Sequence, residues 1–93
     1  MASTFNKDPD ELLDYEWDFS LQLAEDGSDT ITGTPTITVP TGITLENQSN
    51  TTTTITAWLS GGTAGQRYEV ECDMSTVGGR TYSRTILILV RDL

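Results

Sequence analysis

The sequence predicts an all-β fold, a single antiparallel β-sandwich, and three observations lead to it. The 93 residues suffice for one domain. Threonine, a β-branched residue that favours strands, occurs 17 times, and 12 of these threonines lie between Thr30 and Thr56. About six to eight short strand-like segments are separated by glycine, proline and asparagine turns, which is typical of sandwiches and small barrels.

The first ten residues, Met1–Asp10, are polar and are predicted to form an arm. The chain would then divide into an N-terminal arm (1–10) and a sandwich domain (11–93). Within the arm, Asp8-Pro9-Asp10-Glu11 suits the start of one helical turn, because proline fits the first helical position and carboxylates favour a helix N-terminus. The turn cannot extend, since strand-like alternation begins at Leu13.

The first strand is predicted over residues 13–20, where large apolar residues alternate with acidic or polar ones. This period of two indicates a strand with one buried and one solvated face. The set expected in the core is Leu13, Tyr15, Trp17 and Phe19. The set expected to face water is Asp14, Glu16, Asp18 and Ser20.

The middle of the chain is predicted to hold four more strands, at 29–33, 35–39, 43–46 and 51–60. Turns are expected at 24–29 and 40–42, and a loop at 47–50. In segment 51–60, one face holds Ile55, Ala57 and Leu59, and the other holds Thr54, Thr56 and Trp58. Only one of these faces can point inward, so Trp58 is either a core residue or part of an interface.

The end of the chain predicts a hairpin, in which residues 66–77 and 80–92 flank Gly78-Gly79. A Gly-Gly pair is typical of a two-residue primed turn, which would set Val77 opposite Arg80. In that register Asp73 faces Arg84, a favourable pair of charges. The core face of the hairpin would then hold Tyr68, Val70, Cys72 and Met74.

This register leaves an apolar outer face on the last strand, and a shift by one residue would turn Leu87 and Leu89 outward instead. The outer face of a sandwich normally meets water, so we expect a cover from the chain's own arm or a loop, or from another subunit. Partner contacts are therefore predicted for the arm and for the two ambiguous strand faces. The candidate interface residues are Phe5, Asp8, Asp10, Trp58, Ile86, Ile88 and Val90.

The charge of the chain excludes several classes of partner. It carries 14 acidic and 5 basic residues, a net charge of −9. We expect no nucleic acid and no membrane partner, because phosphates and anionic lipids need clustered Lys and Arg. A protein with a basic surface is a partner that this charge does not exclude. The chain start lacks the apolar stretch of a signal peptide, and the longest apolar run, Ile86–Val90, is too short to span a bilayer. Synthesis in a reducing cytoplasm is expected.

No catalytic residue and no cofactor is predicted. Histidine is absent, which removes the commonest general base and metal ligand. Cys72 is expected to point inward between Glu71 and Asp73, whose charges raise its pKa and keep it unreactive. Two acidic clusters offer oxygen ligands for calcium, but neither matches the EF-hand loop, and solvated acidic loops are the favoured interpretation. The clusters are Glu25, Asp26 and Asp29, and Asp8, Asp10, Glu11 and Asp14.

The stretch Trp58–Val70 contains a leucine, a glycine-rich turn and a tyrosine ahead of an alternating strand. It resembles the corner before strand F in immunoglobulin-like and fibronectin type III domains. The resemblance implies that the sandwich is of this type and that the Tyr68 hydroxyl bonds to the upstream backbone. A single cysteine cannot form the disulfide of antibody domains, so only the architecture carries over.

A wider pattern covers most of the chain, and Trp-Leu-Ser-Gly-Gly-Thr-Ala-Gly at 58–65 is its most specific part. Its other parts are Lys7-Asp8-Pro9-Asp10, Leu13-Asp14-Tyr15, Asp18, Asp29-Thr30-Ile31, Tyr68 and Gly79-Arg80. The pattern is similar to small proteins encoded among the virion genes of tailed bacteriophages. That resemblance implies a structural virion protein of the cement, decoration or fibre-stabilising type, made in the bacterial host cytoplasm. It further implies binding to other capsid, fibre, neck or tail subunits and a homo-oligomer or multi-copy assembly.

Two other functions stay open at this point. An adhesive module would bind glycans or another part of the host surface through exposed aromatic side chains such as Trp58. A cytoplasmic regulator would block a basic host protein with its acidic surface, and high salt would weaken that binding.

Overall fold

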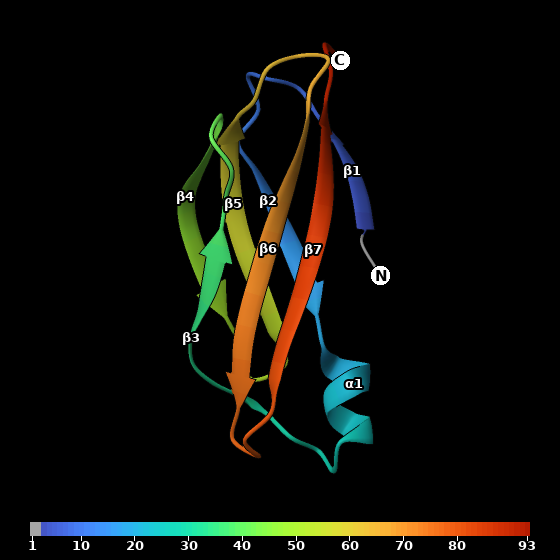
Figure 1. The fold of residues 1–93 in the computed structure, drawn as a ribbon, viewed down its shortest axis with the longest axis vertical. Helices are drawn as coiled ribbons and strands as arrows, with labels where there is room; N and C mark the ends of the chain where they lie inside the picture. The colour runs from blue at the N-terminus through green and yellow to red at the C-terminus, as the bar shows by residue number, and fades with distance from the viewer. Residues whose placement is uncertain (1–2) are drawn as a thin grey trace.

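The computed structural model describes residues 3–93, which form seven strands and one short helix (Figure 1). Their bounds are β1 (Ser3–Lys7), β2 (Leu13–Asp18), α1 (Ser20–Glu25), β3 (Ile31–Thr38), β4 (Ile43–Asn50), β5 (Thr54–Gly61), β6 (Arg67–Thr76) and β7 (Thr81–Val90). Within these residues, no helix has the length and the apolar composition needed to cross a membrane.

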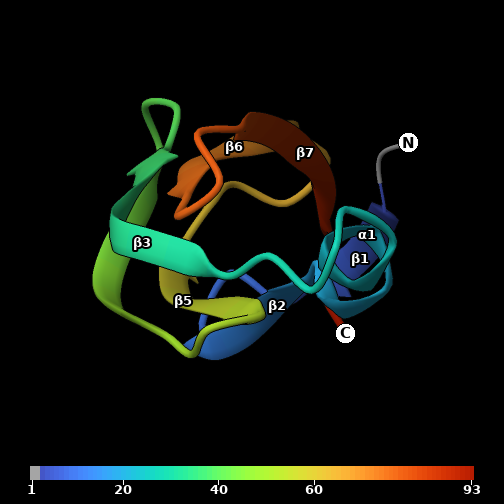
Figure 2. The same cartoon turned by 90° about the horizontal axis from the view of Figure 1, so that it is seen from below.

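The strands form two sheets that face each other across the core (Figure 2). One sheet has four strands in the order β1-β7-β6-β3, and the other has three in the order β2-β5-β4. All neighbours are antiparallel except β1 and β7, which run parallel. Strands β2, β5 and β4 correspond to B, E and D of a constant-type immunoglobulin domain, and β3, β6 and β7 to C, F and G. The predicted all-β, immunoglobulin-like sandwich is confirmed.

Alternate side chains of both sheets build the core, as the period of a strand requires. In β5, Ile55, Ala57 and Leu59 are fully buried, so the face with Trp58 points outward. The alternation in β2 is confirmed, because Tyr15 and Trp17 are buried and the acidic residues between them are exposed. The opposite sheet contributes Val70, Cys72, Met74, Ile86, Ile88 and Val90.

The register predicted for the last hairpin is wrong by one residue. Thr76 and Arg80 close the loop, with the Thr76 N–H donating to the Arg80 carbonyl at 2.8 Å and the Gly79 N–H to the Thr76 carbonyl at 3.0 Å. Gly79 has φ of +86°, which only glycine adopts without strain. The connection is therefore a three-residue loop with a turn and a glycine bulge, rather than a two-residue turn.

In the observed register, the side chains of β7 point to the opposite faces from those predicted. Ile86, Ile88 and Val90 are 3%, 0% and 1% exposed, so the prediction that they face outward is wrong. Ile86 and Ile88 pair with Val70 and Tyr68 of β6, and Asp73 lies opposite Ser83 rather than Arg84. Leu87 and Leu89 take the outward positions and are half-buried.

The segment predicted as a polar arm is largely part of the sandwich, because Ser3–Lys7 form β1 along the edge of β7. Phe5 points inward and packs edge-on against Tyr15, with ring centroids 5.1 Å apart. No helical turn follows it. Instead the Glu11 N–H donates to the Asp8 carbonyl at 3.1 Å and closes a tight turn. Met1 and Ala2 lie outside the described residues, and contact between the arm and a neighbouring subunit stays a prediction.

Three further differences concern element lengths. The segments 29–33 and 35–39 join into one strand, β3, with an irregularity between Thr32 and Thr36. Residues 47–50, predicted as a loop, extend β4. Helix α1 was not predicted, and it spans six residues and buries only Leu23.

Candidate functional site

Cys72, the single cysteine of the chain, lies in the core with no exposed surface. Burial raises the pKa of its thiol to about 12, and the nearby charge of Asp73 acts in the same direction. The inward orientation predicted for Cys72 is confirmed. The thiol stays protonated at neutral pH and cannot act as a thiolate nucleophile.

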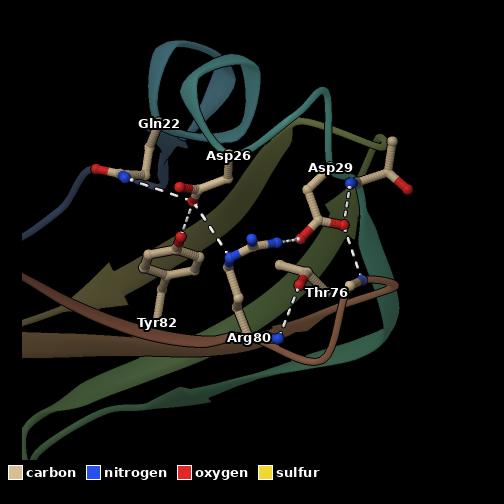
Figure 3. A network of polar contacts seen from close by, with 8 residues as sticks. Gln22, Asp26, Asp29, Thr76, Arg80 and Tyr82 are labelled. Carbon is tan, nitrogen blue, oxygen red and sulfur yellow. Dashed lines mark hydrogen bonds and ion pairs between the residues drawn. The ribbon is translucent and has the colours of Figure 1, made fainter.

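The acidic loop after α1 binds the chain's own donors (Figure 3). The Asp29 carboxylate accepts N–H bonds from Thr30 and Gly78 and a guanidinium bond from Arg80, each at 2.9 Å. Hydrogen bonding by Thr76, together with these donors, lowers the pKa of Asp29 to about 2. These bonds tie the loop to the β6–β7 hairpin.

Asp26, the neighbour of Asp29 in this loop, completes the network. Its carboxylate accepts from the Tyr82 hydroxyl, and Arg80 Nε lies 4.0 Å away (Figure 3). Both carboxylates therefore already have donors from the chain. Within residues 3–93, no cluster of three or more acidic or sulfur ligands is placed to hold a metal ion.

The second acidic cluster lies where β1 ends, and it also stabilises the fold. The Asp8 carboxylate accepts the N–H groups of Asp10 and Leu93, both at 2.9 Å, and these bonds lower its pKa. Lys7 has no exposed surface, and its ammonium donates to the carbonyls of Gly61 at 2.8 Å and Asp8 at 2.9 Å. Asp8, a predicted interface residue, thus bonds Leu93 to the segment after β1, whereas Asp10 is exposed.

The glycine-rich corner after β5 has the bond that the sequence predicted, since the Tyr68 hydroxyl accepts the Thr63 N–H at 2.9 Å. Gly62 lies against β7, and a Cβ there would come within 2.6 Å of a Val90 methyl group. The most specific part of the sequence pattern therefore has a packing role at the corner.

A hollow of about 350 Å³ lies beside the end of β2, between α1 and β7. Trp17 lines it, and the Trp17 indole N–H is buried without a hydrogen-bond partner among the described residues. The guanidinium of Arg84 lies 5.8 Å from the Phe19 ring centroid at its wall. Glu16, Asp18 and Glu25 also line the hollow, so three carboxylates share it with the Arg84 guanidinium.

The outer surface of the three-stranded sheet is the first of two broad surfaces that a partner could contact, and we call it the acidic face. Its centre is Trp58, which is half-buried and lies between Asp14 of β2 and Asn47 of β4. Its carboxylates are Asp14, Glu16, Asp18 and Glu46. Strands β2, β4 and β5, all within the described part of the chain, contain no lysine or arginine.

The outer surface of the four-stranded sheet is different, and we call it the mixed face. It carries Arg67, Glu69, Glu71 and Asp73 on β6, and Leu87 and Leu89 on β7. Asp73 raises the pKa of Glu71 through a hydrogen bond and through its charge. Acidic, basic and apolar side chains therefore meet on this face.

The predicted interface residues consequently separate into three groups. Trp58 and Asp10 lie at the surface, although Trp58 is half-buried. Phe5 and Asp8 make internal contacts. Ile86, Ile88 and Val90 belong to the core. Two features of the site were not predicted from the sequence. Lys7 lies in a polar segment, and nothing in that segment indicates that its side chain is buried. The lack of basic residues on the sheet that carries Trp58 was also not predicted.

A comparison with protein families relates this architecture to known proteins. No curated protein matches the chain. The family model described as podophage GP4 fiber-tail adaptor protein gp77 matches residues 7–89, from the buried Lys7 almost to the end of β7. The match confirms the resemblance to tailed-phage virion proteins. Since it spans most of the sandwich, the chain belongs to this podophage fiber-tail adaptor family of small structural virion proteins.

Proposed function

We propose that the protein is a non-enzymatic adaptor that links the tail fibre to the tail of a podophage particle and stabilises their junction. The family match over residues 7–89 carries this proposal. The protein would be made in the bacterial host cytoplasm and incorporated into the virion in several copies. Its partners are other virion proteins, and binding rather than chemistry is its activity.

The shape and the internal bonds of the domain suit a rigid connector. The molecule extends 43 × 22 × 17 Å. At one end of the strands, Lys7 links β1 of one sheet to β5 of the other. At the other end, Asp29 and Arg80 join the loop between α1 and β3 to the β6–β7 hairpin of the same sheet. The Lys7 bond limits sliding of one sheet against the other, and the Asp29–Arg80 bond fixes the loop, which suits a domain that connects two partners.

The two faces of the sandwich give the adaptor two chemically distinct surfaces. The acidic face carries only negative charge around one tryptophan, and the mixed face combines both charge signs with two leucines. Two unlike surfaces on opposite sides of one domain allow two unlike partners to bind at once.

The direct test uses purified fibre and tail proteins encoded by the same phage genome. The adaptor should bind each of them alone and should bridge them in a ternary complex on size-exclusion chromatography. Mass spectrometry of purified particles should find the chain in amounts comparable to the fibre. An adaptor that binds neither protein, or particles that lack the chain and still hold their fibres, would contradict the proposal.

A second candidate function follows from Trp58. A half-exposed indole beside Asp14 and Asn47 is a combination that can stack on a sugar ring and bond its hydroxyl groups. If the domain contributes to host adhesion, the isolated protein should bind a glycan array, and Trp58→Ala should abolish that binding. Binding that survives in Trp58→Ala would exclude this use of the face.

A further inference from the structure

We propose that the acidic face is the docking surface for a basic patch on one of the two virion partners, with Trp58 receiving an arginine or lysine side chain at its centre. The inference rests on the proposed adaptor function and specifies which surface binds and the chemistry of the partner. The mixed face is left for other contacts.

The strands of the three-stranded sheet carry negative charge that no basic residue on them balances. These three strands carry four carboxylates and no basic residue within the described chain. Two of the protein's five basic residues are occupied elsewhere, since Lys7 bonds backbone carbonyls and Arg80 pairs with Asp29. Arg84 lies over the Phe19 and Tyr82 rings at the wall of the hollow, and within the described residues it forms no ion pair with the β2 carboxylates there. Arg67 and Arg91, the other two, belong to β6 and to the segment after β7, on the opposite sheet.

The carboxylates on β2 lie close enough together to repel one another. Asp14, Glu16 and Asp18 alternate along β2, so neighbours are about 7 Å apart. That spacing is shorter than the Debye length of about 8 Å at physiological salt, so the charges repel one another. In the part of the chain that the structure describes, Asp14 and Glu16 have no cation partner. A cationic surface laid along β2 would relieve this repulsion and gain attraction at the same time.

Trp58 is placed among these carboxylates, where it can contact a cation. It pairs with Asp14 on one side and Asn47 on the other, and it is separate from the core that Ile55, Ala57 and Leu59 build. A cation over the indole face gains a cation–π contact, while the neighbouring carboxylate forms an ion pair with it. Tryptophan is also enriched among the residues that dominate binding energy in protein interfaces.

The same charges exclude both faces of a second copy of this chain as the occupant, since the mixed face of that copy also sets its single arginine, Arg67, among three carboxylates. Two acidic faces placed together would oppose four carboxylates with four more, and like charges across an interface are strongly unfavourable. Nucleic acid is excluded for the same reason. The occupant is therefore a different protein with a basic surface, and the fibre and tail proteins are the partners of the proposed function.

The test compares two charge-matched double variants for binding to purified fibre protein and purified tail protein. D14N/E16Q removes two charges from the acidic face, and E69Q/E71Q removes two from the mixed face. We expect D14N/E16Q to weaken binding to one of the two partners about tenfold, with E69Q/E71Q changing that Kd less than about threefold. Raising the salt should weaken the wild type more than D14N/E16Q.

Trp58 provides an independent readout. Trp58→Ala should weaken binding to the same partner about tenfold or more, while Trp58→Phe, which keeps an aromatic face, should recover part of the loss. Thermal unfolding of each variant verifies that the domain still folds. Because these side chains lie outside the core, midpoints close to the wild type are expected.

The outcomes separate the two proposals. If the wild type binds and both double variants weaken it equally, or neither does, the docking surface is wrong and the adaptor function stands. If Trp58→Phe binds as poorly as Trp58→Ala, the cation–aromatic contact is wrong. If the wild type binds neither partner, the adaptor function fails, and this inference fails with it.

Discussion

The two outer faces of the sandwich carry similar numbers of carboxylates but differ in what surrounds them. On the acidic face, threonines and Trp58 separate carboxylates that no basic residue of those strands neutralises. On the mixed face, Arg67 and two half-buried leucines share the surface with Glu69, Glu71 and Asp73. Net charge alone therefore does not identify a binding surface, since the two faces differ in how their charges are arranged and in whether basic residues lie among them.

A second contrast lies between carboxylates that hold the fold and carboxylates that face outward. Asp29 accepts three hydrogen bonds at 2.9 Å and its side chain is 5% exposed. Asp14 and Glu16 are exposed on the acidic face. Removing the first kind should cost stability, and removing the second kind should cost binding.

The largest loss of stability is expected for a charge placed on the side of β7 that faces the core. Ile88→Asp places a charge where a fully buried side chain packs, and it should destabilise the domain by about 4 kcal/mol or more, enough to leave it unfolded or nearly so. Leu87→Asp, one residue away on the mixed face, should cost only about 1–2 kcal/mol, because that side chain is half-buried and the new charge lies opposite Glu69. Urea denaturation followed by circular dichroism measures both. Similar losses would mean that the orientation of β7 is wrong.

The next effect concerns the lysine that joins the two sheets. Lys7→Met keeps the aliphatic stem but removes both bonds to backbone carbonyls, and it should cost about 1–3 kcal/mol because buried acceptors lose their donor. The matched control is Arg91→Met, at an exposed position, which should change the unfolding free energy by less than about 0.5 kcal/mol. Equal stability of the two variants would contradict the role given to Lys7.

The pH dependence of stability tests the hydrogen bonds to the Asp29 carboxylate. The folded pKa of Asp29, about 2, lies below its ordinary value of 3.8, so its stabilising contribution is present above about pH 4 and is lost as the pH falls toward 2. Asp29→Asn should lower stability at pH 7 and flatten the acid branch of the stability curve. An acid branch as steep in Asp29→Asn as in the wild type would contradict this role of Asp29. Thermal unfolding between pH 2 and pH 7 makes the comparison.

The smallest effect has opposite signs for stability and for binding. Glu16→Lys places a cation among the carboxylates of the acidic face and should stabilise the isolated domain by about 0.2–0.5 kcal/mol. The same change should weaken binding to the basic partner. Thermal midpoints and Kd values measured on one preparation provide both numbers. A destabilised variant would show that the carboxylates of β2 do not repel one another.

Local alternation made much of the fold predictable from the sequence. Tyr15 and Trp17 recur every second residue in a run long enough to fix a strand and its buried face. Tyr68 follows a glycine-rich corner, and that local pattern predicted a bond that the structure contains. Such features depend on residues close together in the chain.

The remaining features depend on contacts that the sequence does not display. Gly78-Gly79 fits either a two- or a three-residue loop, and the apparent pairing of Asp73 with Arg84 favoured the wrong one. That single shift turned Ile88 outward in the prediction. Lys7 becomes a buried residue only because Gly61, 54 positions away, offers its carbonyl. The lack of basic residues on the acidic face likewise becomes evident only when β2, β4 and β5 are seen to form one sheet.

A cryo-EM map of the fibre–tail junction would show whether the acidic face docks a basic partner. We expect Trp58, Asp14 and Glu16 to be buried there against arginine or lysine side chains of the fibre or the tail protein. A junction in which the acidic face is open to solvent while the mixed face holds both partners would contradict it.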